Sequence, residues 1–121
     1  MADGAGSAQF GAYGARITCR FLSGRFREWF QGNSELPTDD ELRYWIDDLR
    51  NRTSAIAARM GTVSRQFAAT LAAIVVVPDE AVTLQIGDSV IVGRSGGEWD
   101  VLCWPENGEY ASSTYFFTDD P

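Results

Sequence analysis

Two aspartates beside glycines are the residues of this chain best suited to metal chemistry. Asp3 precedes Gly4 near the start of the chain, and Asp88 follows Gly87 between two apolar runs. A carboxylate at such a turn can project out of a packed scaffold, and the glycine lets a backbone carbonyl approach the same point. Mg²⁺ and Mn²⁺ prefer oxygen donors of this kind. Each pair alone is weak evidence, because aspartate–glycine pairs most often mark simple turns.

The composition excludes several kinds of active site. The chain contains no histidine, so it lacks the commonest general base and the commonest zinc ligand. Ser-His-Asp and Cys-His mechanisms are therefore excluded within it. Its two cysteines, Cys19 and Cys103, are too few for a disulfide framework and indicate reduced thiols in a cytoplasmic protein. The sequence shows no secretory signal and no apolar run long enough to span a bilayer.

The charge balance narrows the choice of partners. Seventeen acidic residues stand against ten arginines, which gives a formal net charge of −7. An acidic surface disfavours nucleic acid and anionic membranes, since binding to both depends on positive side chains. A phosphorylated substrate remains compatible, because a bound metal ion can supply local positive charge. A length of 121 residues is enough for one modest domain.

Two helices are expected in the first half of the chain. Apolar residues at three-to-four spacing predict a helix over residues 7–31, with Ser7 as its N-cap. Its internal glycines lower intrinsic helicity, which suggests that close packing on a sheet holds it. A second helix begins after Thr38, which forms a capping box with Glu41, and runs to about Met60. One face of this helix is apolar and the other is charged. Such a helix is more often one that covers a sheet than one that binds a partner.

The second half of the chain has strand character. Turn signals at Pro78-Asp79 and at residues 95–97 predict antiparallel hairpins. The run from Leu71 to Val77 is apolar on both faces, so it is expected to be a central strand covered by helices. Trp99 and Trp104 are expected to be core residues. Helices followed by a meander of strands predict an α+β fold rather than a doubly wound parallel sheet. The expected strands are 67–77, 81–86, 89–94, 98–103 and 114–118.

Four ordered segments resemble PP2C-type metal-dependent protein serine/threonine phosphatases of the bacterial branch. The chain opens with Ala-Asp-Gly-Ala-Gly-Ser-Ala (residues 2–8), a segment characteristic of that family. Two middle segments also match, Phe-Ala-Ala-Thr-Leu (67–71) and Gln-Ile-Gly-Asp (85–88). The fourth is the stretch over 104–116, which contains Gly108-Glu109-Tyr110. The resemblance implies part of an α/β/β/α sandwich, with two N-terminal helices packed on an antiparallel sheet.

The resemblance also implies a mechanism and a set of ligands. Such an enzyme hydrolyses phosphoserine and phosphothreonine with Mg²⁺ or Mn²⁺, and a metal-activated water is the nucleophile, so no catalytic side chain is assigned. By resemblance, the Asp3 carboxylate bridges two metals, and the Gly4 carbonyl is a further ligand. Asp88 matches an aspartate that helps to hold a third, weaker metal. As a structural alternative, Asp88 is a strand-end residue whose carboxylate caps nearby backbone N–H groups.

The chain departs from the family pattern in two respects. Ala5 stands where many members carry a histidine that can protonate the leaving alcohol. An N-terminal acidic residue, a phosphate-binding arginine and two C-terminal aspartate motifs are not visible. Residues 1–121 are therefore expected to form a single but incomplete phosphatase domain that exposes sheet edges and an uncovered apolar face. Such a domain is expected either to self-associate through the exposed sheet edges or to fold only marginally.

Two functions remain open at this point. The first is metal-dependent hydrolysis of a phosphorylated protein, with a cognate Ser/Thr kinase as a further partner in signalling. The alternative is a non-catalytic pseudophosphatase, or a fragment that binds a phosphoprotein or a regulator. A third interpretation, that only the scaffold is shared, follows from the general independence of fold and function. The Gly-rich segment 4–7 offers one more possibility, an anion cradle at a helix N-terminus, but it lacks the lysine of a P-loop.

Overall fold

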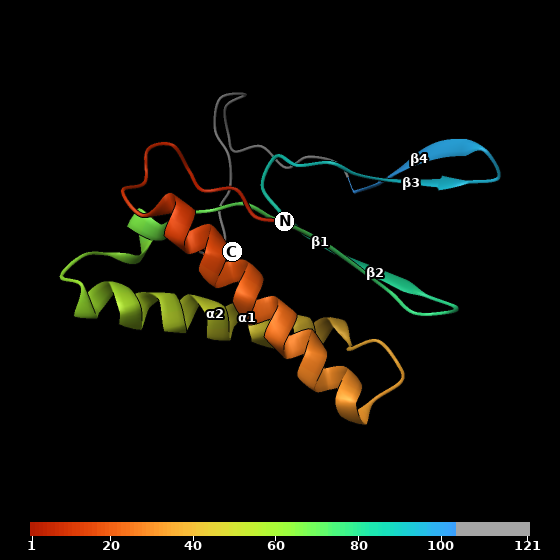
Figure 1. The fold of residues 1–121 in the computed structure, drawn as a ribbon, viewed down its shortest axis with the longest axis horizontal. Helices are drawn as coiled ribbons and strands as arrows, with labels where there is room; N and C mark the ends of the chain where they lie inside the picture. The colour runs from red at the N-terminus through yellow and green to blue at the C-terminus, as the bar shows by residue number, and fades with distance from the viewer. Residues whose placement is uncertain (104–121) are drawn as a thin grey trace.

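The computed structural model describes residues 1–103 and shows an α+β arrangement of helices and antiparallel strands (Figure 1). The expected α+β class is therefore confirmed. The final strand expected at 114–118, the Gly108-Glu109-Tyr110 segment and Trp104 lie outside the described residues. In chain order the elements are α1 (Gly11–Gly32), α2 (Asp39–Arg59), the short 3₁₀ helix η1 (Ser64–Phe67), β1 (Leu71–Val76), β2 (Ala81–Ile86), β3 (Ile91–Ser95) and β4 (Glu98–Cys103).

Helix α1 begins four residues later than expected. Phe10, not Ser7, occupies the N-cap position, and no side chain caps the helix there. Residues between Ala5 and Phe10 form turns because tertiary bonds hold them: the Phe10 N–H donates to the carbonyl of Gln66 at 2.8 Å. The prediction of Ser7 as N-cap was therefore wrong. The predicted end was correct, since α1 stops at Gly32 and Asn33 is extended.

Helix α2 follows its sequence signals closely. The Thr38 hydroxyl accepts from the backbone N–H of Glu41 at 3.3 Å, and three acidic residues occupy the first turn. Acidic side chains there interact favourably with the positive end of the helix dipole. The helix closes before Gly61, which has a φ of 71°, a conformation that favours glycine. Met60, expected on the apolar face, is 47% exposed.

Close packing explains Gly14 of α1. A Cβ at Gly14 would lie 1.9 Å from the carbonyl oxygen of Phe67, so α1 and η1 meet at this residue. The expected close approach is therefore real, although the partner is η1 rather than a strand. Gly24 has no atom within 4 Å of its hypothetical Cβ, so packing does not explain that glycine.

The four strands form two hairpins. β1 pairs with β2 in a register that places Leu71 opposite Ile86, and β3 pairs with β4. Gly96 and Gly97 link β3 to β4 with φ values of 61° and 86°, and two positive values of this kind are typical of a type I′ turn. Among the described residues these hairpins form two separate two-stranded sheets, which corrects the expectation of one sheet.

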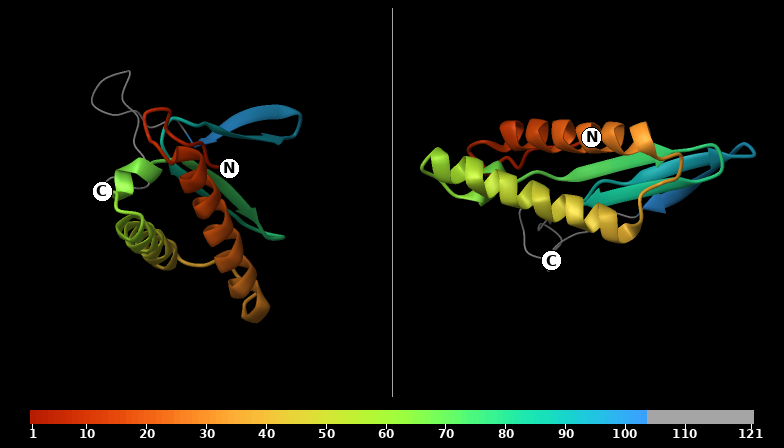
Figure 2. Two further views of the ribbon diagram at one scale, coloured as in Figure 1. Left: turned by 60° about the vertical axis from the view of Figure 1, so that its left-hand side comes forward. Right: turned by 90° about the horizontal axis from the view of Figure 1, so that it is seen from below.

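The core lies between the helices and one face of β1 and β2. Figure 2 shows α1 and α2 side by side along the strands, while the β3–β4 hairpin lies farther from the helices. Leu22 of α1, Ile46 of α2 and Leu71 of β1 are buried together. A second cluster joins Leu49 to Ala69. Burial of these side chains is the main favourable contribution to the packing of helices on strands.

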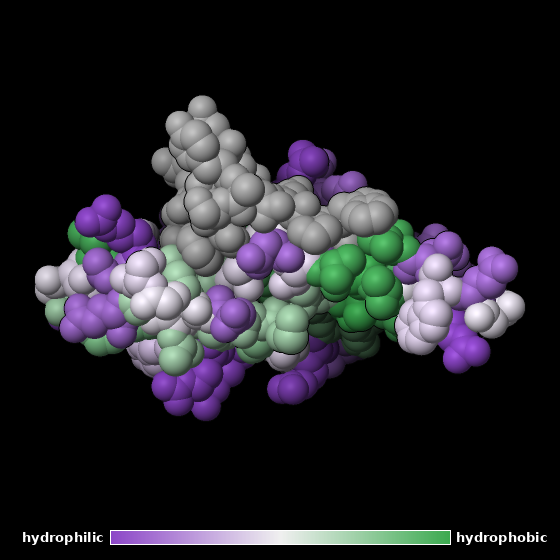
Figure 3. Space-filling view, turned by 90° about the horizontal axis from the view of Figure 1, so that it is seen from above, coloured by the Kyte–Doolittle hydropathy of each residue, from purple (hydrophilic) through white to green (hydrophobic). Residues whose placement is uncertain are grey.

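The opposite face of β1 is open, contrary to expectation. Ile74 is 48% exposed and Val76 is 70% exposed, so helices cover only one side of this strand. Trp99, expected in the core, is 67% exposed on β4. Figure 3 shows hydrophobic residues gathered beside the polar tip at the end of the molecule that carries the hairpins. Both faces of β1 are apolar, as predicted. Among residues 1–103, however, no second layer of helices covers the face that carries Ile74 and Val76.

Two further expectations concern cysteines and membranes. Cys19 is a free, half-buried thiol, as expected. Within the described part of the chain, no helix combines the length and apolar character needed to cross a bilayer.

Candidate metal centre

The segment that carries Asp3 is extended and lies along β1, outside the named strands. The N-terminal amine of Met1 donates to the carbonyl of Ala72 at 2.7 Å, and the Ala72 N–H donates back to the Met1 carbonyl at 2.8 Å. An antiparallel bridge joins Gly4 to Ala69. The segment therefore occupies the edge of β1 that β2 leaves open, which explains why Figure 1 shows the N-terminus beside the strands.

Thr70 holds the Asp3 backbone in place. Its N–H donates to the Asp3 carbonyl at 2.8 Å, and its hydroxyl lies 3.5 Å from the same oxygen. Thr70 is only 6% exposed, whereas the Asp3 side chain is exposed. The Asp3 carboxylate is exposed on a held backbone, but the segment is extended here rather than the turn that the sequence predicted.

Gly4 is required by packing against α1. A Cβ at Gly4 would lie 2.2 Å from the carbonyl carbon of Gly11, and a Cβ at Gly11 would lie 2.8 Å from the carbonyl oxygen of Ala5. The two glycines therefore let the N-terminal segment and the first turn of α1 approach each other closely. This contact, which the sequence did not reveal, accounts for Gly4 independently of any metal.

Asp88 lies where the chain leaves β2. The β1–β2 ladder ends at the pair Leu71–Ile86, and Gly87 then adopts a φ of 113°, which a residue with a side chain rarely adopts. Gly87 is buried, while Asp88 is exposed. The bend thus turns the aspartate outward at the end of the strand.

The two aspartate segments flank the same end of β1. Asp3 bonds to Thr70 on one side, and the register places Gly87 next in line beyond the Leu71–Ile86 pair on the other side. The Asp3 segment and the Gly87 bend therefore lie on opposite sides of the chain at Thr70. The structure brings the segments to one place, and no bond joining the two carboxylates is observed among the described residues.

The donors match a hard divalent cation in kind but not in number. Asp3, Gly4 and Asp88 offer only oxygen ligands, the type that Mg²⁺ and Mn²⁺ favour. Within residues 1–103, no three or more Asp, Glu, Cys or His side chains are arranged so that they could hold a metal ion. Since Mg²⁺ demands near-octahedral coordination, these residues would form only part of a ligand shell.

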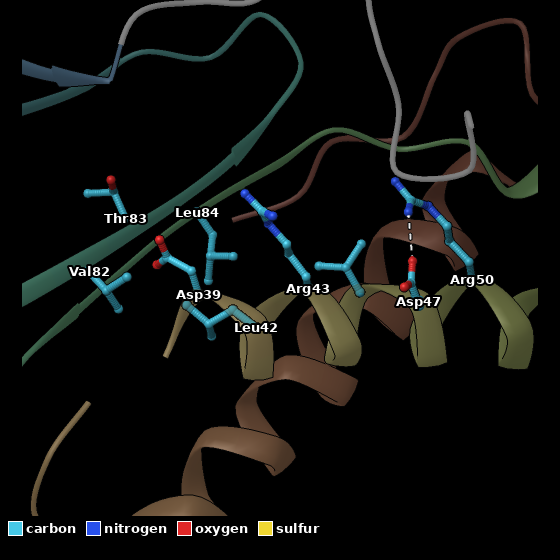
Figure 4. A pocket seen from close by; sticks show the side chains of 9 residues that line it. Asp39, Leu42, Arg43, Asp47, Arg50, Val82, Thr83 and Leu84 are labelled. Atoms are coloured by element: carbon cyan, nitrogen blue, oxygen red, sulfur yellow. Dashed lines mark hydrogen bonds and ion pairs between the residues drawn. The ribbon is translucent and has the colours of Figure 1, made fainter. Parts of the chain in front are cut away.

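A separate pocket lies between α2 and β2. Its volume is about 590 Å³, and Figure 4 shows side chains of the helix and the strand that line it. Arg50 pairs with Asp47 at 3.1 Å along its rim. Leu84 and Ile46 in its wall belong to the core side of the strands, whereas Asp3 lies opposite Thr70 on the other face. The pocket therefore does not include the expected metal ligands. Its lining residues are Asp39, Leu42, Arg43, Ile46, Asp47, Arg50, Val82, Thr83 and Leu84.

Comparison with known proteins identifies the family of this chain. A family model described as protein phosphatase 2C matches residues 1–121. The chain belongs to this family.

One curated relative of this protein phosphatase 2C chain is serine/threonine-protein phosphatase 3 of Escherichia coli (strain K12). The two are 33% identical over 121 residues, which cover 99% of this chain and 47% of the relative. The chain therefore spans about half the length of the curated relative that it matches. No solved structure gives a significant match.

Sequence reasoning missed one polar side chain beside Asp88 in this member of the protein phosphatase 2C family. The side-chain amide of Gln85 donates to the carbonyl of Ser89 at 2.5 Å and lies 3.5 Å from the carbonyl of Gly87. The available signal was a polar residue inside an apolar strand, two positions before a Gly-Asp bend. A polar side chain that is partly buried in a strand is expected to form hydrogen bonds with groups close to it.

Proposed function

We propose that this chain takes part in metal-dependent hydrolysis of phosphoserine and phosphothreonine in proteins. Its membership of the protein phosphatase 2C family and its relative named a serine/threonine-protein phosphatase support this class of reaction. The observation that carries the proposal is structural: the Asp3 segment and the Gly87-Asp88 bend flank Thr70 at one end of β1. A phosphorylated protein is the proposed substrate, and a Ser/Thr kinase that makes it is the proposed counterpart.

In this proposal the chain's own residues hold and orient Mg²⁺ or Mn²⁺. The Asp3 carboxylate and the Gly4 carbonyl bind on one side of Thr70, and the Asp88 carboxylate binds on the other. Bound divalent ions supply an activated water and positive charge that offsets the charge of the phosphate. Thr70 holds the Asp3 backbone, so only the aspartate side chain has to be ordered on binding. The remaining oxygen donors come from outside residues 1–103.

A non-catalytic module is the second candidate. The observation that favours it is the lack of any cluster of three ligating side chains among the described residues. In that case the chain binds a phosphoprotein or a regulator and leaves the phosphate in place.

Phosphate release from a phosphothreonine peptide separates the two functions. The full chain is incubated in millimolar Mn²⁺ with and without chelator, beside Asp3→Ala and the control Asp79→Ala, whose exposed carboxylate lies in the β1–β2 turn. Chelator-sensitive release that is lost in Asp3→Ala and kept in Asp79→Ala supports hydrolysis. A folded chain that releases no phosphate but binds the peptide favours the non-catalytic module.

We also propose that copies of the chain self-associate through the open face of β1. Ile74 and Val76 expose apolar side chains there, and exposed apolar patches of this kind commonly mark interaction surfaces. A second copy that covers this face would remove both side chains from water.

A further inference from the structure

We infer that Gln85 is a positioning residue that fixes the bend after β2 and thereby orients the Asp88 carboxylate toward a divalent cation. This inference deepens the proposed function and rests on it. Gln85 does not itself reach the cation in this scheme. Its amide holds the backbone on both sides of Asp88, and the aspartate supplies the ligand oxygen.

The bonding of the Gln85 amide closes a loop around Asp88. Its Nε2 donates to the carbonyl of Ser89 at 2.5 Å and lies 3.5 Å from the carbonyl of Gly87. The two carbonyls belong to the residues that immediately precede and follow Asp88. A single side chain therefore holds the backbone on both sides of the residue that carries the carboxylate.

The carbonyls need a donor because the ladder has ended. β2 pairs with β1 only as far as Ile86, and the φ of 113° at Gly87 takes the chain away from β1. A glycine at this position gives the bend freedom, since glycine adopts many backbone conformations at low cost. The Gln85 amide offsets that freedom by supplying the hydrogen bonds that the strand no longer provides.

The backbone of Gln85 is anchored by pairing within the sheet. It lies opposite Ala72, and Ala72 exchanges two hydrogen bonds with Met1 on its other side. The backbone of Gln85 is therefore part of a row of three aligned residues. A side chain that starts from so fixed a point can hold a bend, whereas one on a loop cannot.

The position of Gln85 separates this role from core packing. Its neighbours Leu84 and Ile86 pack against the buried core, and strand alternation points Gln85 to the other face. Asp3 and Thr70 belong to that same face, because directly opposed residues in an antiparallel ladder project to one side. A substitution at Gln85 is therefore expected to change the bend without opening the core.

The effect is measured by Mn²⁺ affinity of the full chain. Calorimetric titration is run on wild type, Gln85→Met and the control Gln31→Met, which removes an exposed amide at the end of α1. We expect Gln85→Met to weaken Mn²⁺ binding by about 10-fold, as is typical when a residue that orients a metal ligand is lost. Gln31→Met is expected to bind as wild type does.

A double-mutant cycle tests whether Gln85 acts through Asp88. In an Asp88→Asn background, Gln85→Met should cause no further loss of affinity. Amide hydrogen exchange gives a second readout: the exchange of Asp88 and Ser89 should accelerate in Gln85→Met and stay unchanged in Gln31→Met. If Gln85→Met fails to fold, Gln85→Asn replaces it, because its amide is one methylene too short to reach the Ser89 carbonyl in the same way.

The outcomes separate this inference from the proposed function. An equal loss of affinity with and without Asp88, or no loss and no faster exchange, overturns the positioning role. Asp88→Asn that binds Mn²⁺ as tightly as wild type overturns the metal role of Asp88, and with it the function assigned to the bend. The inference is supported if Gln85→Met lowers the Mn²⁺ affinity only when Asp88 is present and also accelerates the amide hydrogen exchange of Asp88 and Ser89.

Discussion

The N–H of Thr70 donates to the backbone carbonyl of Asp3 at 2.8 Å, and this bond joins residues 67 positions apart in the chain. Thr70 immediately precedes β1, whose first residue, Leu71, lies in the buried core. The carboxylate proposed to bind metal is therefore tied, through one residue, to the best-packed part of the molecule. Substitutions that disturb this contact should move the backbone of Asp3 even though they leave its side chain unchanged.

Gly4→Ala should detach the N-terminal segment from α1. The new methyl group would lie 2.2 Å from the Gly11 backbone, which neither segment can accommodate without moving. We expect a loss of about 1–3 kcal/mol in the free energy of unfolding and faster hydrogen exchange of the Thr70 amide. Gly6→Ala is the control, because no atom lies within 4 Å of its Cβ position. Equal behaviour of the two variants would contradict the packing account.

Gly14→Ala and Gly24→Ala should have opposite effects within one helix. The Cβ of the first would lie 1.9 Å from the Phe67 carbonyl oxygen, and that of the second meets nothing within 4 Å. Overpacking should cost Gly14→Ala about 1–3 kcal/mol. Gly24→Ala should gain up to about 1 kcal/mol from the higher helix propensity of alanine. Thermal midpoints from circular dichroism measure both, and a stabilised Gly14→Ala would show that α1 and η1 do not meet there.

Asp48→Asn should weaken the contact between α1 and α2. Asp48 pairs with Arg25 of α1 and with Arg52 of its own helix, the latter at 3.3 Å, and both guanidinium groups lie over the ring of Phe21. Because the aspartate is partly buried, we expect a cost of about 0.5–1 kcal/mol, smaller at high salt. Asp47→Asn, which removes a more exposed partner of Arg50, should change the urea midpoint little. The prediction fails if both variants unfold alike.

Charges placed on the open face of β1 should suppress self-association. The double variant Ile74→Lys/Val76→Lys removes two exposed apolar side chains and introduces repulsion between copies. Sedimentation velocity should show a lower average mass than wild type at the same concentration. Tyr44→Lys is the control, because Tyr44 is 68% exposed but lies on α2, away from this face. A monomeric wild type would refute the proposed self-association.

Local signals predicted the parts of the fold that local contacts create. The capping box at Thr38, the end of α1 at Gly32 and the hairpin turn at Gly96-Gly97 all appear where expected. Each depends on residues within a few positions of one another. The start of α1 was misplaced because Gln66, far along the chain, holds the preceding turn through bonds to Gln9 and Phe10.

The sequence predicted only some of the residues of the candidate site. Asp3, Gly4 and Asp88 could be proposed as ligands from their residue types and from resemblance. The contact that makes Gly4 necessary was hidden, because it involves the first turn of a helix whose placement the pattern did not reveal. Gln85 was overlooked for a related reason: an isolated polar residue in a strand has no identified partner until the bend beyond it is seen.

The sequence alone determined the family, the α+β class and the residue types that can bind a hard cation, because these follow from composition, periodicity and short ordered motifs. Only the tertiary structure decided that the N-terminal segment lies along β1, that Asp3 and the Gly87 bend flank Thr70, and that one face of β1 is open. The physical reason is distance along the chain. Hydrogen bonds and close contacts between residues about 70 positions apart depend on how the whole core packs, and no local pattern encodes that arrangement.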